Sequence, residues 1–126
     1  MRLLSIALLT LLVAPLMAAD LEGRYTGEWT GGAAAGDLRL TLSRAGEEWK
    51  CEAVFTLGGQ EVPTTMKRVK VDGDKVEVEY EFDLQGNKLK STLTGQLDGQ
   101  TLSGKYHTVD NGGGAVDEGS WKVARK

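Results

Sequence analysis

Gly23-Arg24-Tyr25-Thr26-Gly27-Glu28-Trp29-Thr30 is the stretch of the chain that decides the fold. Its odd positions hold glycine or an aromatic residue, and its even positions hold charged or hydroxylated residues. Because side chains of a β-strand alternate between two faces, this pattern predicts a strand with one apolar and one polar face. The same device, a glycine followed two residues later by an aromatic, recurs at Gly104 and Tyr106 and at Gly119 and Trp121.

Seven further runs with the same alternation follow, and no window of useful length shows a helical period. The chain therefore predicts eight strands separated by glycine-rich turns. The first and last apolar-face residues of the seven further runs are Leu38–Leu42, Trp49–Leu57, Val62–Val71, Val76–Leu84, Leu89–Leu97, Leu102–Thr108 and Gly119–Val123. In the run from 62 to 71 the apolar positions change from even to odd numbers, which predicts a β-bulge near Lys67 and Arg68.

Turn residues predict how the runs pair. Gly86-Asn87 suits a two-residue hairpin turn, and Asp98-Gly99 suits another. The first turn would place three pairs opposite each other on the apolar face: Leu84 with Leu89, Phe82 with Ser91, and Tyr80 with Leu93.

Two turns compete at residues 72 to 74. Asp72-Gly73 is the more typical turn dipeptide, but it sets Lys70 opposite Lys75. Gly73-Asp74 sets Lys70 opposite Glu77 and Arg68 opposite Glu79. We favour this second turn because opposite charges across two strands stabilise the pair.

Eight short antiparallel strands joined by hairpins predict an all-β fold, an eight-stranded antiparallel up-and-down β-barrel in which the first strand pairs with the last. A two-sheet β-sandwich is the alternative. Gly27, Gly95, Gly104 and Gly119 favour the barrel, because glycine inside a strand is tolerated at tight barrel bends. Eight strands enclose a space that is filled by side chains or by one small ligand.

Gly27-Glu28-Trp29, or one register earlier Gly23-Arg24-Tyr25, resembles the Gly-x-Trp that opens the first strand of calycin-type barrels. That superfamily includes lipocalins and avidin-like proteins. Gly119-Ser120-Trp121 resembles the tryptophan of its closing strand. The resemblance implies a calycin-like barrel, whereas the lipocalin helix and the biotin-binding loops have no counterpart in the sequence. The chain is also similar to small exported bacterial β-barrel domains of unassigned role, and a shared fold does not imply a shared ligand.

The first residues have the layout of a secretory signal peptide. A basic start, Met1-Arg2, precedes the apolar run Leu3–Leu16 and then the small residues before Asp20. This predicts a signal peptide over residues 1–19, cleaved after Ala18 or Ala19, and a single domain over residues 20–126. The apolar run is shorter than the roughly 20 residues that span a bilayer, which favours a cleaved leader over the alternative, an uncleaved anchor. The protein is expected to be exported, periplasmic or secreted, without a stable membrane anchor.

The charge of the domain limits which partners it can bind, and its cysteine content shows whether a disulfide can stabilise it. Without Arg2 the domain carries 14 basic and 18 acidic side chains. This weakly acidic, mixed surface argues against nucleic acid or anionic membrane as the main partner. Cys51 is the only cysteine, so no internal disulfide forms. Its position on the apolar face favours a small buried hydrophobe over a reactive thiol.

Four carboxylates lie on the polar face of one run, at positions 77, 79, 81 and 83. Arg68 and Lys70 flank them on one side, and Lys88 and Lys90 flank them on the other. Exposed cross-strand ion pairs explain this stripe better than a calcium site does, because calcium prefers converging loop oxygens. We expect no metal site.

No constellation of catalytic groups is visible in the sequence. His107 is the only histidine, and its place between Tyr106 and Thr108 puts it on the polar face. A catalytic triad needs a histidine held between a nucleophile and an acid. No carboxylate is expected to point inward among the apolar residues, and no phosphate-binding glycine loop is present. We therefore expect a non-enzymatic protein without catalytic residues or cofactors.

Two functions remain. One is a carrier of a small apolar ligand, with a cavity lined by seven aromatic residues and with loops 31–36 and 110–114 gating its mouth. The seven residues are Tyr25, Trp29, Trp49, Phe55, Tyr80, Phe82 and Tyr106. The other is a protein-interaction module, an inhibitor or accessory domain with a packed core. An interior volume of about 300 Å³ or more, open at the mouth, would favour the carrier.

Overall fold

The computed structural model describes residues 20–126, so the predicted signal peptide, residues 1–19, lies outside the described residues. Nine antiparallel strands form a single sheet. They are β1 (Gly23–Gly31), β2 (Ala35–Ala45), β3 (Glu48–Leu57), β4 (Gln60–Val62), β5 (Thr65–Asp72), β6 (Lys75–Leu84), β7 (Asn87–Asp98), β8 (Thr101–Val109) and β9 (Ala115–Arg125). The all-β class and the up-and-down connections predicted from the alternation are confirmed.

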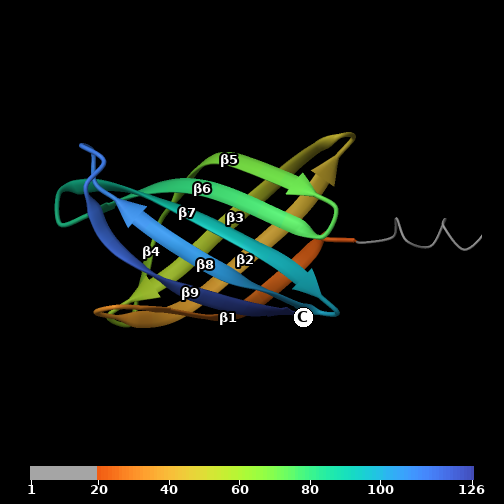
Figure 1. The fold of residues 1–126 in the computed structure, drawn as a ribbon, viewed down its shortest axis with the longest axis horizontal. Coiled ribbons are helices and arrows are strands. Elements are labelled where there is room, and N and C mark those ends of the chain that lie inside the picture. Colours follow the sequence, from red (N-terminus) through yellow and green to blue (C-terminus); the bar gives the residue numbers. More distant parts are fainter. Residues whose placement is uncertain (1–19) are drawn as a thin grey trace, which may run out of the picture.

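The sheet curls strongly but does not close (Figure 1). Its strand order is β4-β3-β2-β1-β9-β8-β7-β6-β5, and it curls through 246° into an open half-barrel. The predicted pairing of the first strand with the last is present, with Trp29 of β1 opposite Trp121 of β9. The predicted closed eight-stranded barrel is wrong, because β4 and β5 remain as two edges of one sheet.

The opening arises where one predicted strand divides into two. The run from Val62 to Val71 is interrupted at Pro63, which has no backbone N–H to donate to a ladder. β4 therefore pairs with β3, whereas β5 pairs with β6 on the other side of the opening. The Thr64 hydroxyl, in the connection between β4 and β5, donates to the Ala53 carbonyl of β3 at 2.7 Å. We call the gap between β3 and β5 the seam.

The β5–β6 hairpin has the predicted register. Lys70 lies opposite Glu77 and Arg68 opposite Glu79, as the turn at Gly73-Asp74 requires. The register shifts between Met66 and Arg68, which confirms the predicted bulge. The bulge restores Val69 and Val71 to the inner face after the change of phase.

The β6–β7 hairpin differs from its predicted register by two residues. Its turn is Gln85-Gly86, both with positive φ (53° and 84°), as a type I′ turn requires. Phe82 therefore lies opposite Leu89, and Tyr80 opposite Ser91. This register sets two acidic residues, Glu81 and Asp83, opposite lysines, whereas the predicted register would have done so only for Asp83.

The β7–β8 turn is also displaced from the predicted dipeptide. It occupies Gly99-Gln100 instead of Asp98-Gly99, so Leu97 lies opposite Leu102. The observed turn thus places two leucines together on the inner face.

Glycines allow the sheet to bend and its tryptophans to pack. A Cβ atom on Gly104 would lie 1.8 Å from the Thr94 carbonyl oxygen of the neighbouring strand. A Cβ atom on Gly95 would lie 2.4 Å from the ring of Trp121. The first glycine permits close strand approach at a bend, and the second makes room for the indole ring.

The N-terminal segment covers the end of the half-barrel at which β1 begins (Figure 1). Leu21 and Tyr25 are both fully buried, and the Tyr25 hydroxyl donates to the Leu21 carbonyl at 2.8 Å. The Arg125 guanidinium donates to the carbonyls of Asp20 and Glu22, at 2.7 and 2.6 Å. This end is filled by side chains, so any cavity must open at the other end.

Candidate functional site

A cavity of about 250 Å³ lies at the end of the half-barrel opposite Leu21. The loops after β1, β3, β6 and β8 gather at this end (Figure 1), and they include the two loops predicted at the mouth, 31–36 and 110–114. Ala33, Ala34 and Val116, from two of these hairpins, line the mouth. Inner-face side chains from β1, β2, β3, β6, β7, β8 and β9 line the walls. The volume falls short of the about 300 Å³ that we set above as favouring a carrier, so the interior is neither filled nor as large as an ordinary ligand pocket.

Five aromatic residues form one side of the cavity. The Trp29 ring meets the rings of Phe55 and Tyr106 edge to face, with centroids 6.1 and 6.0 Å apart. Phe55 meets Phe82 in the same way at 4.9 Å. Tyr80 lies 6.1 Å from both phenylalanines. Edge-to-face pairs stabilise a fixed arrangement of rings, so this wall is preformed for an apolar or aromatic ligand.

Of the seven predicted ligand-binding residues, five line the cavity: Trp29, Phe55, Tyr80, Phe82 and Tyr106. Tyr25 and Trp49 do not. Tyr25 packs at the filled end, with the Arg125 guanidinium 5.2 Å from its ring centroid. Trp49 is half-buried near the seam, under the guanidinium of Arg44 at 5.5 Å. Period-two alternation places all seven on the inner face, but it does not say at which end of a strand the interior is filled.

A row of polar side chains, which shares Tyr80 with the aromatic wall, crosses the cavity lining on four neighbouring strands. Tyr80, Ser91, Thr108 and Asp117 lie directly opposite one another on β6, β7, β8 and β9. All four line the cavity. The hydroxyls of Ser91 and Thr108 are buried and 2.6 Å apart, so one donates to the other. We call these four residues the polar row.

Asp117 was missed by the sequence reasoning, which expected no inward carboxylate. That expectation is wrong, because β9 begins at Ala115 and its inner face includes Asp117 before Gly119 and Trp121. The alternation from Trp121 backwards would have found it, had the last run been extended by two residues. Asp117 Oδ2 accepts a hydrogen bond from the Tyr106 hydroxyl at 2.7 Å, and Oδ1 accepts one from the Gly32 N–H at 3.1 Å.

The two tyrosines of the cavity stay neutral at physiological pH. Burial raises the pKa of Tyr80 well above its usual value, although the Ser91 hydrogen bond opposes the shift. Burial also raises the pKa of Tyr106, and both the hydrogen bond to Asp117 and the charge of that carboxylate add to the shift. Both phenols therefore act as hydrogen-bond donors and not as bases.

The mouth loop after β8 is held by its own first residue. Asp110 Oδ1 accepts hydrogen bonds from the N–H groups of Gly112 and Gly114, at 2.9 and 2.8 Å. Its backbone also pairs with Gly114 at 2.9 Å and with Gly113 at 3.0 Å. The loop after β1 is tied to the wall by the bond from Gly32 to Asp117. The predicted gating by these loops stays a prediction.

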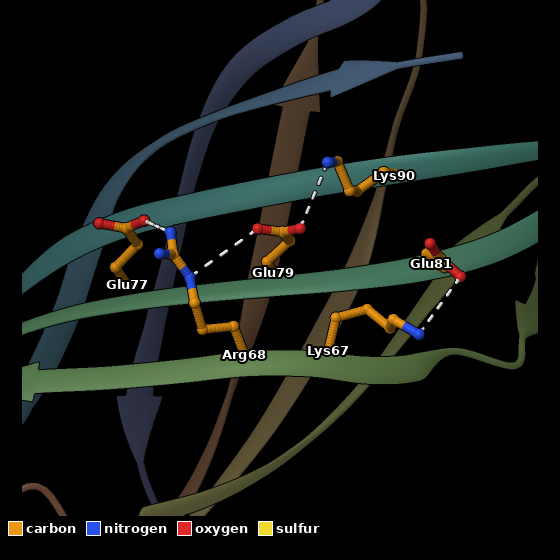
Figure 2. A network of polar contacts seen from close by, with 6 residues as sticks. All are labelled: Lys67, Arg68, Glu77, Glu79, Glu81 and Lys90. Atoms are coloured by element: carbon orange, nitrogen blue, oxygen red, sulfur yellow. Dashed lines mark hydrogen bonds and ion pairs between the residues drawn. The ribbon is translucent and has the colours of Figure 1, made fainter. Parts of the chain in front are cut away.

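Three of the four acidic residues on the outer face of β6 form ion pairs, and these three are drawn in Figure 2 with their partners. Arg68, Lys88 and Lys90 take part as expected, Lys67 also takes part, and no ion pair of Lys70 or Asp83 is found among residues 20–126. The Arg68 guanidinium contacts the carboxylates of both Glu77 and Glu79. Lys90 Nζ lies 3.3 Å from Glu79, and Lys67 Nζ lies 3.9 Å from Glu81. These cross-strand ion pairs account for the stripe as a solvent-facing side of the sheet. Within residues 20–126, no three histidine, cysteine or acidic side chains gather to hold a metal ion.

Cys51 and His107 lie outside the cavity lining. Cys51 is buried and unpaired, and burial, with a smaller contribution from the Glu52 carboxylate, raises the pKa of its thiol to about 12. The thiolate that would react is thus strongly disfavoured, in line with a structural role. His107 is exposed on the outer face, opposite Glu118 of β9.

Comparison with protein-family models, with curated proteins and with solved structures finds no match to this chain. Within residues 20–126 the structure has no helix that is long and apolar enough to cross a membrane.

Proposed function

We propose that this chain is an exported, non-enzymatic protein that binds a small apolar ligand in the cavity at the open end of its half-barrel. The observation that carries the proposal is the cavity of about 250 Å³ with its aromatic wall. A dry cavity of about 150 Å³ lined by aliphatic and aromatic residues is large enough to bind benzene. The space here thus suits a ligand with one ring or a short chain. The export part of the proposal rests on the signal-peptide pattern.

The calycin resemblance belongs to the same proposal. The curled antiparallel sheet and the Gly-x-Trp motif agree with a barrel that holds its ligand at one end, although the seam leaves this barrel open. A non-enzymatic role is supported by the hydrogen bond between Ser91 and Thr108. Neither hydroxyl pairs with an imidazole or carboxylate base in the part of the chain that the structure describes.

The test is a binding titration with a panel of small aromatic and aliphatic compounds, read by calorimetry and by tryptophan fluorescence. Trp29 and Trp121 both line the cavity, so binding should change the emission. A filled-cavity variant, Leu89→Trp, should abolish binding. Leu97→Trp is its matched control, because Leu97 lies on the inner face of the same strand but outside the cavity lining.

Dissociation constants below about 100 μM that Leu89→Trp weakens at least tenfold, and that Leu97→Trp leaves unchanged, would support a carrier. If no compound binds below about 1 mM, the carrier proposal fails, since such weak binding is worth only about 4 kcal/mol.

The seam favours the second candidate function, a protein-interaction module. β5 pairs with β6 on one side only, and the inner-face residues Met66, Val69 and Val71 beside the seam are half-buried. An unpaired strand edge is a template for an added strand from a partner protein. Hydrogen exchange on a purified complex would test this, with protection expected along Thr65–Asp72. Protection confined to the mouth loops would instead contradict strand addition at the seam.

A further inference from the structure

Asp117 is the only acidic or basic side chain, among those of residues 20–126, that lines the cavity. We propose that the ligand is a small aromatic or aliphatic amine, whose ammonium group pairs with Asp117 while its apolar body lies against the aromatic wall. This inference rests on the proposed function, because it specifies what the same cavity binds.

The Asp117 carboxylate has hydrogen-bond acceptor positions that the described residues leave unused. A carboxylate offers about four acceptor positions on its two oxygens. The Tyr106 hydroxyl and the Gly32 N–H occupy one on each oxygen. Ser91 and Thr108 are joined to each other by one hydrogen bond within the polar row. Asp117 is the member of the row that combines unused acceptor positions with a charge.

The charge of Asp117 is not balanced by a neighbouring cation. Its carboxylate forms no ion pair with the residues that the structure describes, unlike Glu77, Glu79 and Glu81 on the outer face. No lysine, arginine or histidine from the described chain lines the cavity. Apolar walls lower the local dielectric constant, so the carboxylate attracts a cation and repels an anion more strongly than it would in water. An anionic ligand such as a fatty acid is therefore disfavoured.

The aromatic wall also suits a cation beside Asp117. The Tyr106 hydroxyl touches the carboxylate, and the Trp29 ring lies 6.0 Å from the Tyr106 ring. An ammonium group at the carboxylate would thus lie near two aromatic rings, and cation–π attraction acts over a ring face within about 6 Å of its centroid. Phe55 and Phe82 continue the wall for the ligand's apolar body.

A purely structural role for Asp117 is the competing explanation, since it ties the loop after β1 to Tyr106. The two roles differ in one measurable property. A structural carboxylate supports binding of all ligands equally, whereas a recognition carboxylate discriminates by ligand charge.

The test uses three compounds with one apolar body: 3-phenylpropylamine, 3-phenylpropanol and 3-phenylpropanoate. Calorimetry at neutral pH and constant ionic strength should find the amine bound about tenfold or more tightly than the alcohol, and the acid bound most weakly. In Asp117→Asn, which keeps the shape and one acceptor oxygen, the amine should lose that advantage. The affinity for the alcohol should change less than about threefold, because the alcohol is uncharged and gains no charge–charge attraction from Asp117.

Glu118→Gln is the matched control. It removes the same charge from the neighbouring residue, which is exposed on the outer face opposite His107. Amine affinity should stay within about twofold, since exposed charges are screened by solvent and salt. Circular dichroism melting of both variants checks that each is folded. If Asp117→Asn does not fold, the order amine, alcohol, acid in the unchanged protein still decides the matter.

Three results separate the possibilities. Equal binding of alcohol and amine, or an amine advantage that survives Asp117→Asn, overturns the amine inference and leaves the carrier function standing. Preferred binding of the acid also overturns it. Failure of all three compounds, together with failure of the wider panel above, overturns the carrier function and the amine inference with it.

Discussion

Trp121→Ala tests whether the tryptophans are held as the structure shows. The Trp121 ring is 3% exposed, it lies over Gly95, and its indole N–H donates to the Lys105 carbonyl at 3.0 Å. Truncating a buried tryptophan to alanine costs about 3–5 kcal/mol, of which the lost hydrogen bond accounts for about 1. Folded domains of this size are stable by about 5–15 kcal/mol, so the variant should lose a large part of its free energy of unfolding.

Two further substitutions divide that cost. Trp121→Phe keeps a ring over Gly95 but loses the indole N–H, so it should cost about 1–2 kcal/mol. Trp49→Ala removes a half-buried ring at the seam and should cost clearly less than Trp121→Ala. Sequence periodicity alone would rank the two alanine variants equal, since both tryptophans lie on inner faces.

Urea titration, followed by far-ultraviolet circular dichroism, gives the free energy of unfolding and its denaturant slope for each variant. A loss below about 1 kcal/mol for Trp121→Ala would refute the burial on which the value rests. A loss for Trp49→Ala equal to that for Trp121→Ala would mean that Trp49 is as deeply buried in solution as Trp121, and hence that the seam is closed there.

The remaining predictions concern a glycine, the cysteine, the ion pairs and the leader. Gly95→Ala forces a Cβ atom to within 2.4 Å of the Trp121 ring and should cost about 1–3 kcal/mol in urea titration, whereas Gly112→Ala, with no neighbour closer than 3.6 Å, should cost less than about 0.5. Burial raises the pKa of the folded Cys51 thiol to about 12, so the stability that the neutral thiol contributes is complete below about pH 8.5. That contribution falls as the pH rises toward 12, by at most about 1.4 kcal/mol per pH unit. The free energy of unfolding of Cys51→Ala should therefore fall less steeply with rising pH than that of the unchanged protein, and an equal fall would contradict this. Glu79→Gln breaks the contacts to Arg68 and Lys90 but should cost less than about 1 kcal/mol, because these pairs are exposed, and a larger loss would mean that the network is shielded from solvent. The exported protein should begin near Ala19 or Asp20 by intact mass, and a mass that retains residues 1–16 would contradict cleavage.

The alternation of side chains was sufficient to predict the class of the fold. Period two assigns each residue to one face, so the strands of the inner core were readable from Gly23 to Val123. The β5–β6 register and the bulge before Arg68 were also readable, because a change of phase and a charge pattern are both local signals. A turn at Asp72-Gly73 would have set Lys70 opposite Lys75, so the charge pattern favoured the turn at Gly73-Asp74, which sets Lys70 opposite Glu77.

The registers of the next two hairpins were not decided locally. A shift of two residues keeps every side chain on its own face, so alternation cannot distinguish the predicted β6–β7 pairing from the observed one. The sum of cross-strand contacts decides, here through Glu81 and Lys90 in one hairpin and Leu97 and Leu102 in the next. The seam at Pro63 was likewise a tertiary outcome, because the missing N–H matters only once a neighbouring strand is placed beside it.

The cavity shows the same division between sequence and structure. The sequence determined that seven aromatic residues face inward, and five of them do line the cavity. Only the tertiary structure decided that Leu21 and Tyr25 fill one end, and that Tyr80, Ser91, Thr108 and Asp117 form one row across four strands. The physical reason is that the face to which a side chain points is a property of one strand, whereas its depth in the interior and its neighbours depend on how all the strands are staggered around the curl.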